Sequence, residues 1–156
     1  MYIVSAALFI SGIAFVIAGA RTTQAATPAA APPAITSVAT VKQLMDGIIG
    51  PSATVVFDSV GTIVDATGIH ENQPRTDAEW ATVSGSAAAL VESANLLVIG
   101  NRAIDRQDWV TMSKALADAG MLVLKATEAK DPQGILAAGE TLNATCDNCH
   151  QRYSRE

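Results

Sequence analysis

The residues that could do chemistry gather near the C-terminus of this 156-residue chain, where Cys146, Cys149 and His150 stand in the pattern Cys-x-x-Cys-His. Two thiols three residues apart on a helical turn can each add to one vinyl group of the same haem, and the adjacent imidazole can bind the iron. The chain contains no other cysteine, so the pattern is more specific than a pair from a cysteine-rich sequence. We therefore predict one covalent haem c, attached through Cys146 and Cys149, with His150 as the proximal iron ligand.

Other uses of two closely spaced cysteines fit the sequence less well. A thioredoxin-like pair belongs at a helix N-terminus, where the helix dipole lowers a thiol pKa, whereas these cysteines come late in a helical pattern. A structural zinc site needs four ligands, and the chain adds only the remote His70 to the motif. A disulfide between Cys146 and Cys149 would constrain very little chain. A chance match is the fourth alternative.

The residue opposite His150 would decide what such a haem does. Met45 lies about as far from the start of the first expected helix as His150 lies from the end of the last, at 1.5 Å per residue, so the two are level in an antiparallel bundle. A thioether ligand there gives a low-spin haem suited to electron transfer. If Met45 instead only fills the core, apolar neighbours leave a five-coordinate iron in a dry pocket. We expect Ile48, Ile49 and Tyr153 to contact the haem.

Two further side chains are possible ligands, and one enzyme class is possible at an open iron. Met112 is a weaker candidate at the same end of the expected bundle, and His70 falls in a connection at the far end. Peroxidase chemistry would need an acid-base group on the open side of the iron, and none is evident near Met45. The sequence therefore predicts a binding or electron-transfer protein that is not an enzyme.

Four stretches with helical periodicity would position these residues, at about 38–68, 76–99, 109–130 and 132–153. The capping-box pattern Thr76-Asp77-Ala78-Glu79 predicts the start of the second helix, and Asp131-Pro132 predicts the start of the fourth. The apolar stripes expected for the first three helices are Val38, Val41, Met45 and Ile48, continued by Val55, Val56, Val60 and Ile63; Trp80, Val83, Ala87, Leu90, Ala94 and Leu97; and Trp109, Met112, Leu116, Ala119, Val123 and Ala126. In the first stretch, Gly50-Pro51 predicts a kink or break, because proline removes a backbone donor and crowds the preceding turn. No stretch alternates in the manner of a strand. Short connections between four amphipathic helices predict an all-α, antiparallel up-down-up-down four-helix bundle.

The N-terminal residues indicate export. Residues 1–20 carry no charge and form an apolar run, and small residues near position 25 suit a signal peptidase. We therefore divide the chain into a signal peptide (1–25), an Ala/Pro-rich linker (26–37) and a haem-binding bundle (38–156), and we place the protein in the periplasm. The alternative is an uncleaved membrane tether through residues 1–20, because the run is long enough to span a bilayer and lacks a preceding Lys or Arg.

Composition narrows the choice of partners. A net charge of -5 argues against nucleic acid, because a phosphate-binding surface needs an excess of cations. Redox partner proteins and small molecules are the remaining expectation.

The stretch from Gly139 to Tyr153, at the end of a four-helix pattern, resembles the class II c-type cytochromes, the cytochrome c′ family and its low-spin relatives. The resemblance implies a four-helix bundle with one haem near the C-terminus, a bacterial periplasmic location and, in many members, a homodimer. Lys42-Gln43-Leu44-Met45 is similar to the stretch in which some low-spin members carry methionine. The family commonly has Arg after the tyrosine, whereas this chain has Ser154 there, between Tyr153 and Arg155.

Three classes of function follow. The first is electron transfer by a mono-haem cytochrome. The second is a five-coordinate cytochrome c′-like protein that binds nitric oxide or carbon monoxide, and it differs from the first only at the sixth iron position. The third is a haem-free redox or structural helical protein, which would be colourless.

Overall fold

The computed structural model describes residues 35–154. The predicted signal peptide and most of the predicted linker lie outside the described residues. The elements follow one another in the order α2 (Val41–Leu44), η1 (Met45–Ile49), α3 (Gly50–Asp58), β1 (Gly61–Asp65), β2 (Gly68–Asn72), α4 (Asp77–Val98), α5 (Asp108–Glu128) and α6 (Pro132–Tyr153).

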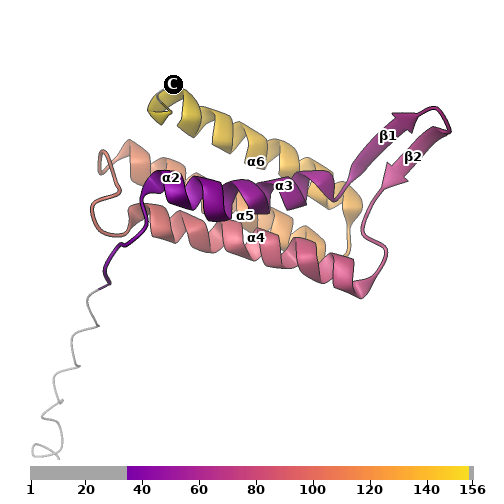
Figure 1. Cartoon of the computed structure of the whole chain (residues 1–156), viewed down its shortest axis with the longest axis horizontal. Coiled ribbons are helices and arrows are strands. Elements are labelled where there is room, and N and C mark those ends of the chain that lie inside the picture. Colours follow the sequence, from indigo (N-terminus) through magenta and orange to yellow (C-terminus); the bar gives the residue numbers. More distant parts are fainter. Residues whose placement is uncertain (1–34, 155–156) are drawn as a thin grey trace, which may run out of the picture. The chain divides into compact units, whose positions relative to one another are not determined.

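The described chain is mostly helical, as predicted, and four helices pack together around one core (Figure 1). The first of them is continuous and consists of α2, the π-helical turn η1 and α3. It packs against α4 and more lightly against α6, while α5 has extensive contacts with both α4 and α6. Each helix contributes a buried apolar stripe, so their packing encloses the core. The fully buried side chains at its centre include Val56, Leu90, Val123, Ile135 and Leu142.

A small hairpin between α3 and α4 corrects the all-α prediction. The first helix was expected to continue to Gly68, but it ends at Asp58, and β1 and β2 form an antiparallel pair that projects from the helices (Figure 1). Gly61 and Gly68 have φ angles of 153° and 133°, which side chains rarely allow, so glycine permits the chain to leave the helix and to turn. The β-branched run Thr62–Val64 also favours a strand over a helix.

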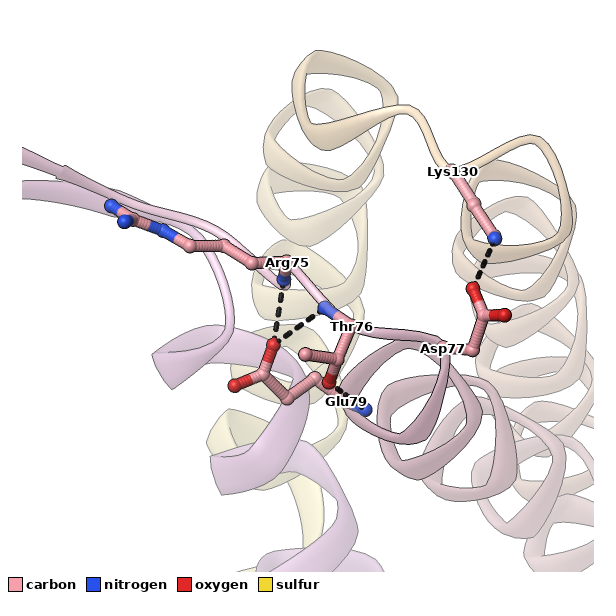
Figure 2. Close-up of polar contacts among 5 residues, drawn as sticks. All are labelled: Arg75, Thr76, Asp77, Glu79 and Lys130. Carbon is pink, nitrogen blue, oxygen red and sulfur yellow. Dashed lines mark hydrogen bonds and ion pairs between the residues drawn. The ribbon is translucent and has the colours of Figure 1, made fainter.

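The start of α4 confirms the predicted capping box (Figure 2). The Glu79 backbone N–H donates to the Thr76 hydroxyl at 3.2 Å, and the Glu79 carboxylate accepts from the backbone N–H groups of Arg75 and Thr76 at 2.7 and 2.8 Å. These bonds lower the pKa of Glu79. Beside the box, Lys130 from the turn between α5 and α6 pairs with Asp77 at 2.6 Å. The first turn of α4 therefore has partners for amides that a helix end leaves free.

The predicted break at Gly50-Pro51 is absent, because the chain stays helical through both residues. The adjustment occurs one turn earlier, in the π-helical turn η1. The buried residues around this turn are Leu44 and Ile49. The expected stripe ran instead through Val38, which is exposed, and through three residues that are only partly buried, Val41, Met45 and Ile48. A widened turn shifts the helix face by one residue, which explains the difference.

Candidate haem site

An apolar cavity lies between the first helix, α4, α5 and α6. Its volume is about 180 Å³, which is below the roughly 300–1,000 Å³ usual for small-molecule and cofactor sites, and the cavity is open to solvent on one side. It is lined by Met45, Ile49, Gly50, Ala53, Leu97, Trp109, Met112, Ser113, Leu116, Thr145, Cys146, Cys149 and His150.

All three residues of the Cys-x-x-Cys-His motif belong to this lining. They lie in the last two turns of α6, so the helical spacing of three places both thiols on one face. Cys146 and Cys149 are partly buried free thiols, and His150 lies at the mouth of the cavity. This wall of the cavity thus presents two thiols and an imidazole towards an apolar space.

The electrostatics of the two thiols differ from those of a redox-active pair. Burial raises the pKa of Cys146, with smaller effects from the neighbouring Asp147 carboxylate and from Cys149, and burial also raises the pKa of Cys149. A catalytic thiol of the thioredoxin type needs a lowered pKa, because the thiolate is the nucleophile. The environment of this pair therefore counts against the thioredoxin interpretation.

Another wall of the cavity comes from η1 and α3. Met45 and Ile49, one helical turn apart, line it together with Gly50 and Ala53. Met112 from α5 also lines the cavity. The structure therefore brings both methionines that the sequence suggested as ligands into one cavity with His150.

Trp109 forms a further wall at the start of α5. Its side chain is 4% exposed, and its indole Nε1 donates to the backbone oxygen of Leu97 at 2.8 Å. Tyr153 packs edge-on against the Trp109 ring, with the ring centroids 4.9 Å apart. A buried, hydrogen-bonded indole keeps one rotamer, so this wall is rigid.

Two of the predicted haem contacts, Ile48 and Tyr153, are not among the lining residues. Ile48 packs against the core as a partly buried side chain. The Tyr153 hydroxyl donates to Asp105 and accepts from Arg152 Nε at 3.2 Å, and the Arg152 guanidinium pairs with Asp108 at 2.5 Å. Tyr153 thus lies behind Trp109 and ties the end of α6 to the connection before α5.

His70 lies away from this cavity, as predicted. It is in strand β2, where its Nε2 is 2.7 Å from the Thr67 hydroxyl and 3.5 Å from Asp65. Within residues 35–154, no three His, Cys, Asp or Glu side chains are grouped so as to hold a metal ion by themselves.

Several lining residues were expected only as core. Leu97, Trp109 and Leu116 belong to the apolar stripes predicted for the second and third helices, and the stripes converge on the motif at one end of the molecule. Their position at the motif end of their helices could have indicated that they line the cavity. Gly50 and Ser113 gave no such signal, because neither continues a stripe.

The residues present fit a c-type haem. The cavity offers two free thiols at the required spacing, an imidazole next to the second thiol, a largely apolar surround and two thioethers. Comparison of the chain with protein-family models, curated proteins and solved structures found no match.

Proposed function

We propose that this chain is an exported mono-haem c-type cytochrome that transfers electrons, with the cofactor held by Cys146, Cys149 and His150. When bound, haem would supply a one-electron redox couple in an apolar surround, which the protein tunes through ligands, burial and nearby charge. We further propose that the four helices form an antiparallel up-down-up-down bundle in the manner of the class II c-type cytochromes. Support for this topology is the packing of each helix against the next and the tight connection 129–131 between α5 and α6.

The single observation that carries the proposal is the shared cavity. Two thiols and an imidazole that are adjacent in sequence line an apolar space walled by all four helices. A disulfide or a chance Cys-x-x-Cys pair has no need of such a space. A periplasmic location and redox partner proteins remain part of the proposal on the sequence evidence.

We propose Met45 as the sixth ligand. It lines the same cavity from the first helix, which packs against α6, the helix that carries His150. Met112 is the competing candidate, because it lines the cavity from α5. Separate Met45→Leu and Met112→Leu variants distinguish the two methionines. Only the first is expected to abolish low-spin coordination.

The test is expression in an exporting host that attaches c-type haem, followed by denaturing mass spectrometry and absorption spectra of the oxidised and reduced protein. A mass increase of one haem that survives denaturation is expected in the wild type and in the His70→Ala control. It is expected to vanish when Cys146 and Cys149 are both replaced by Ala. A colourless, unmodified wild-type chain would overturn the proposal.

A second candidate function is binding of nitric oxide or carbon monoxide at an open sixth position. The observation in its favour is the apolar lining of the cavity. Among the described residues that line it, only Ser113 and Thr145 carry a hydroxyl group. Carbon monoxide separates the candidates. An absorption spectrum that does not change on addition of carbon monoxide favours Met45 ligation and electron transfer. A high-spin spectrum that shifts on addition of the gas favours the second function.

A further inference from the structure

The turn that presents Met45 to the cavity is not a regular α-helical turn. The backbone N–H of Gly50 donates to the carbonyl oxygen of Met45, five residues earlier, which makes η1 a π-helical turn inside a continuous helix. Such turns are rare and occur often at functional sites. Here the turn joins Met45 to Gly50, and both residues line the cavity.

The π turn decides which side chains face inward. In a regular α-helix, residues five apart point about 140° away from each other, at about 100° per residue. Leu44 and Ile49 are five apart, yet both are buried, with 4% and 5% exposed. A π turn acts as a one-residue insertion, and it allows both to face the core.

The same geometry fixes the residue at the cavity wall. Suppose that the segment became α-helical while α3 kept its place. Each residue before the turn would then occupy the place that its preceding neighbour has now. Met45 would then enter the core position of Leu44, and Asp46 would take the cavity position of Met45. A carboxylate would thus replace a thioether on this wall of the cavity.

Gly50 is the residue on which the turn depends. A Cβ atom at Gly50 would lie 2.9 Å from the carbonyl oxygen of Met45, closer than real Cβ atoms come to a backbone atom. The oxygen belongs to the backbone of the turn, so it cannot move aside without changing the turn. Gly47, in the same segment, has open space within 4 Å of the position that a Cβ atom would take, and it therefore serves as a matched position.

We propose that Gly50 is a positioning residue that keeps η1 in its π form, so that Met45 and not Asp46 faces the haem cavity. This inference rests on the proposed function for its consequence at the iron. Its structural part, the hydrogen bond from Gly50 to Met45, can be tested without the cofactor.

The experiment compares Gly50→Ala with Gly47→Ala in the full chain. The first readout is NMR of the haem-free protein, in which a through-hydrogen-bond coupling should join the residue-50 nitrogen to the Met45 carbonyl carbon. We expect this coupling in the wild type and in Gly47→Ala, and its loss in Gly50→Ala. The second readout is the spectrum of the exported holoprotein, where only Gly50→Ala should become high-spin and bind carbon monoxide while keeping its covalent haem.

A rescue variant covers the case in which Gly50→Ala does not fold. Deleting Gly47 shortens the turn by one residue, so that residue 50 bonds to Met45 at α-helical spacing and a methyl group at position 50 fits. The combined deletion and Gly50→Ala variant is expected to regain folding and a low-spin haem that ignores carbon monoxide.

The possible failures are separable. Absence of the Gly50–Met45 coupling in the wild type, a low-spin Gly50→Ala protein, or a combined variant that is not rescued would each overturn the inference. A wild-type chain that takes up no haem would overturn the proposed function instead, and the NMR comparison would still decide whether Gly50 maintains the turn.

Discussion

The two ends of the helical unit are held together by different kinds of interaction. At the cavity end, the start of α2, the connection 99–107 and the end of α6 meet. At the hairpin end lie β1, β2, the start of α4 and the turn 129–131. The first end joins distant segments through part-buried side-chain bonds, whereas the second has a local capping box and one exposed ion pair, Lys130–Asp77.

Side chains from the connection 99–107 make the long-range bonds at the cavity end. Arg102 Nε donates to the Ala39 backbone oxygen at 2.9 Å, and its Nη1 donates to the Leu96 backbone oxygen at 2.8 Å. Asp105 accepts from the Tyr153 hydroxyl, 48 residues later. These bonds fix the first helix and α6 relative to each other, on either side of the cavity.

The hairpin end has a capping box and an exposed ion pair. The Lys130–Asp77 pair is largely solvated, so it contributes little to stability. Both strands of the hairpin are exposed along nearly their whole length. The contrast indicates that this chain concentrates its specific interactions where it must keep a cavity open between helices.

The largest expected effects come from the two tryptophans. Trp109 belongs to the cavity end, and Trp80 is buried in the first turn of α4 at the hairpin end. Truncation of either to Ala should cost about 3–5 kcal/mol of unfolding free energy, measured by denaturant titration. Only Trp109→Ala should also change the haem spectrum, because only Trp109 lines the cavity. Equal spectral changes in both variants would contradict the proposed difference between the two ends.

A smaller effect is expected from Tyr153→Phe, and it depends on pH. The Tyr153 hydroxyl is the main cause of the lowered pKa of Asp105, with the Trp109 backbone N–H second. A lowered pKa in the folded state means that the Asp105 contribution is present above the ordinary value of 3.8 and is lost as the pH falls through the folded-state pKa.

Melting temperatures measured from neutral pH down to about pH 3 test this linkage. The wild type should lose stability on acidification, and Tyr153→Phe should start lower and lose less. Lys114→Met is the control, since it removes an exposed ion pair with Asp118 on α5 and leaves the Tyr153–Asp105 bond in place. A Tyr153→Phe protein with the wild-type acid profile would show that the bond to Asp105 does not hold the end of α6.

Local signals in the sequence were sufficient for the starts of two helices. The capping pattern from Thr76 to Glu79 correctly predicted the start of α4, and Asp131-Pro132 correctly marked the start of α6, although the Asp131 side chain makes no capping bond. Proximity of Met45 to the motif followed from counting residues from two helix ends. The helix starts were predicted correctly because each depends on spacing within one element, whereas the position of Met45 also depended on the order of the helices.

The two features that the sequence reasoning missed both involve glycine. Ile63 continued an apolar pattern and was assigned to a helix, but Gly61 and Gly68 allow a hairpin in which Ile63 is exposed. The π turn at Gly50 shifted the buried stripe by one residue. Periodicity cannot reveal either case, because a few apolar residues fit a helix face or a strand equally well.

The next prediction uses the two capping boxes, one at each end. Thr40 caps α2 with Gln43, and Thr76 caps α4 with Glu79. Thr40→Ala and Thr76→Ala should each lower the unfolding free energy by about 1 kcal/mol. Only Thr40→Ala should loosen the turn before Met45, seen as faster carbon monoxide uptake by the holoprotein. If Thr76→Ala gave the same faster uptake, the two ends would be coupled more strongly than the structure indicates.

The smallest effect is expected in the hairpin, where Val64 and Ile69 face each other across the strands and are both 74% exposed. Val64→Thr should change the unfolding free energy by no more than about 0.5 kcal/mol, as for other surface substitutions. The matched control is Val56→Thr in α3, where the side chain is fully buried and the same exchange places a hydroxyl in the core, at a cost of about 1–3 kcal/mol. A Val64→Thr variant as unstable as Val56→Thr would mean that the hairpin is covered in solution. The hairpin end would then also depend on a buried long-range contact, and the contrast between the two ends would fail.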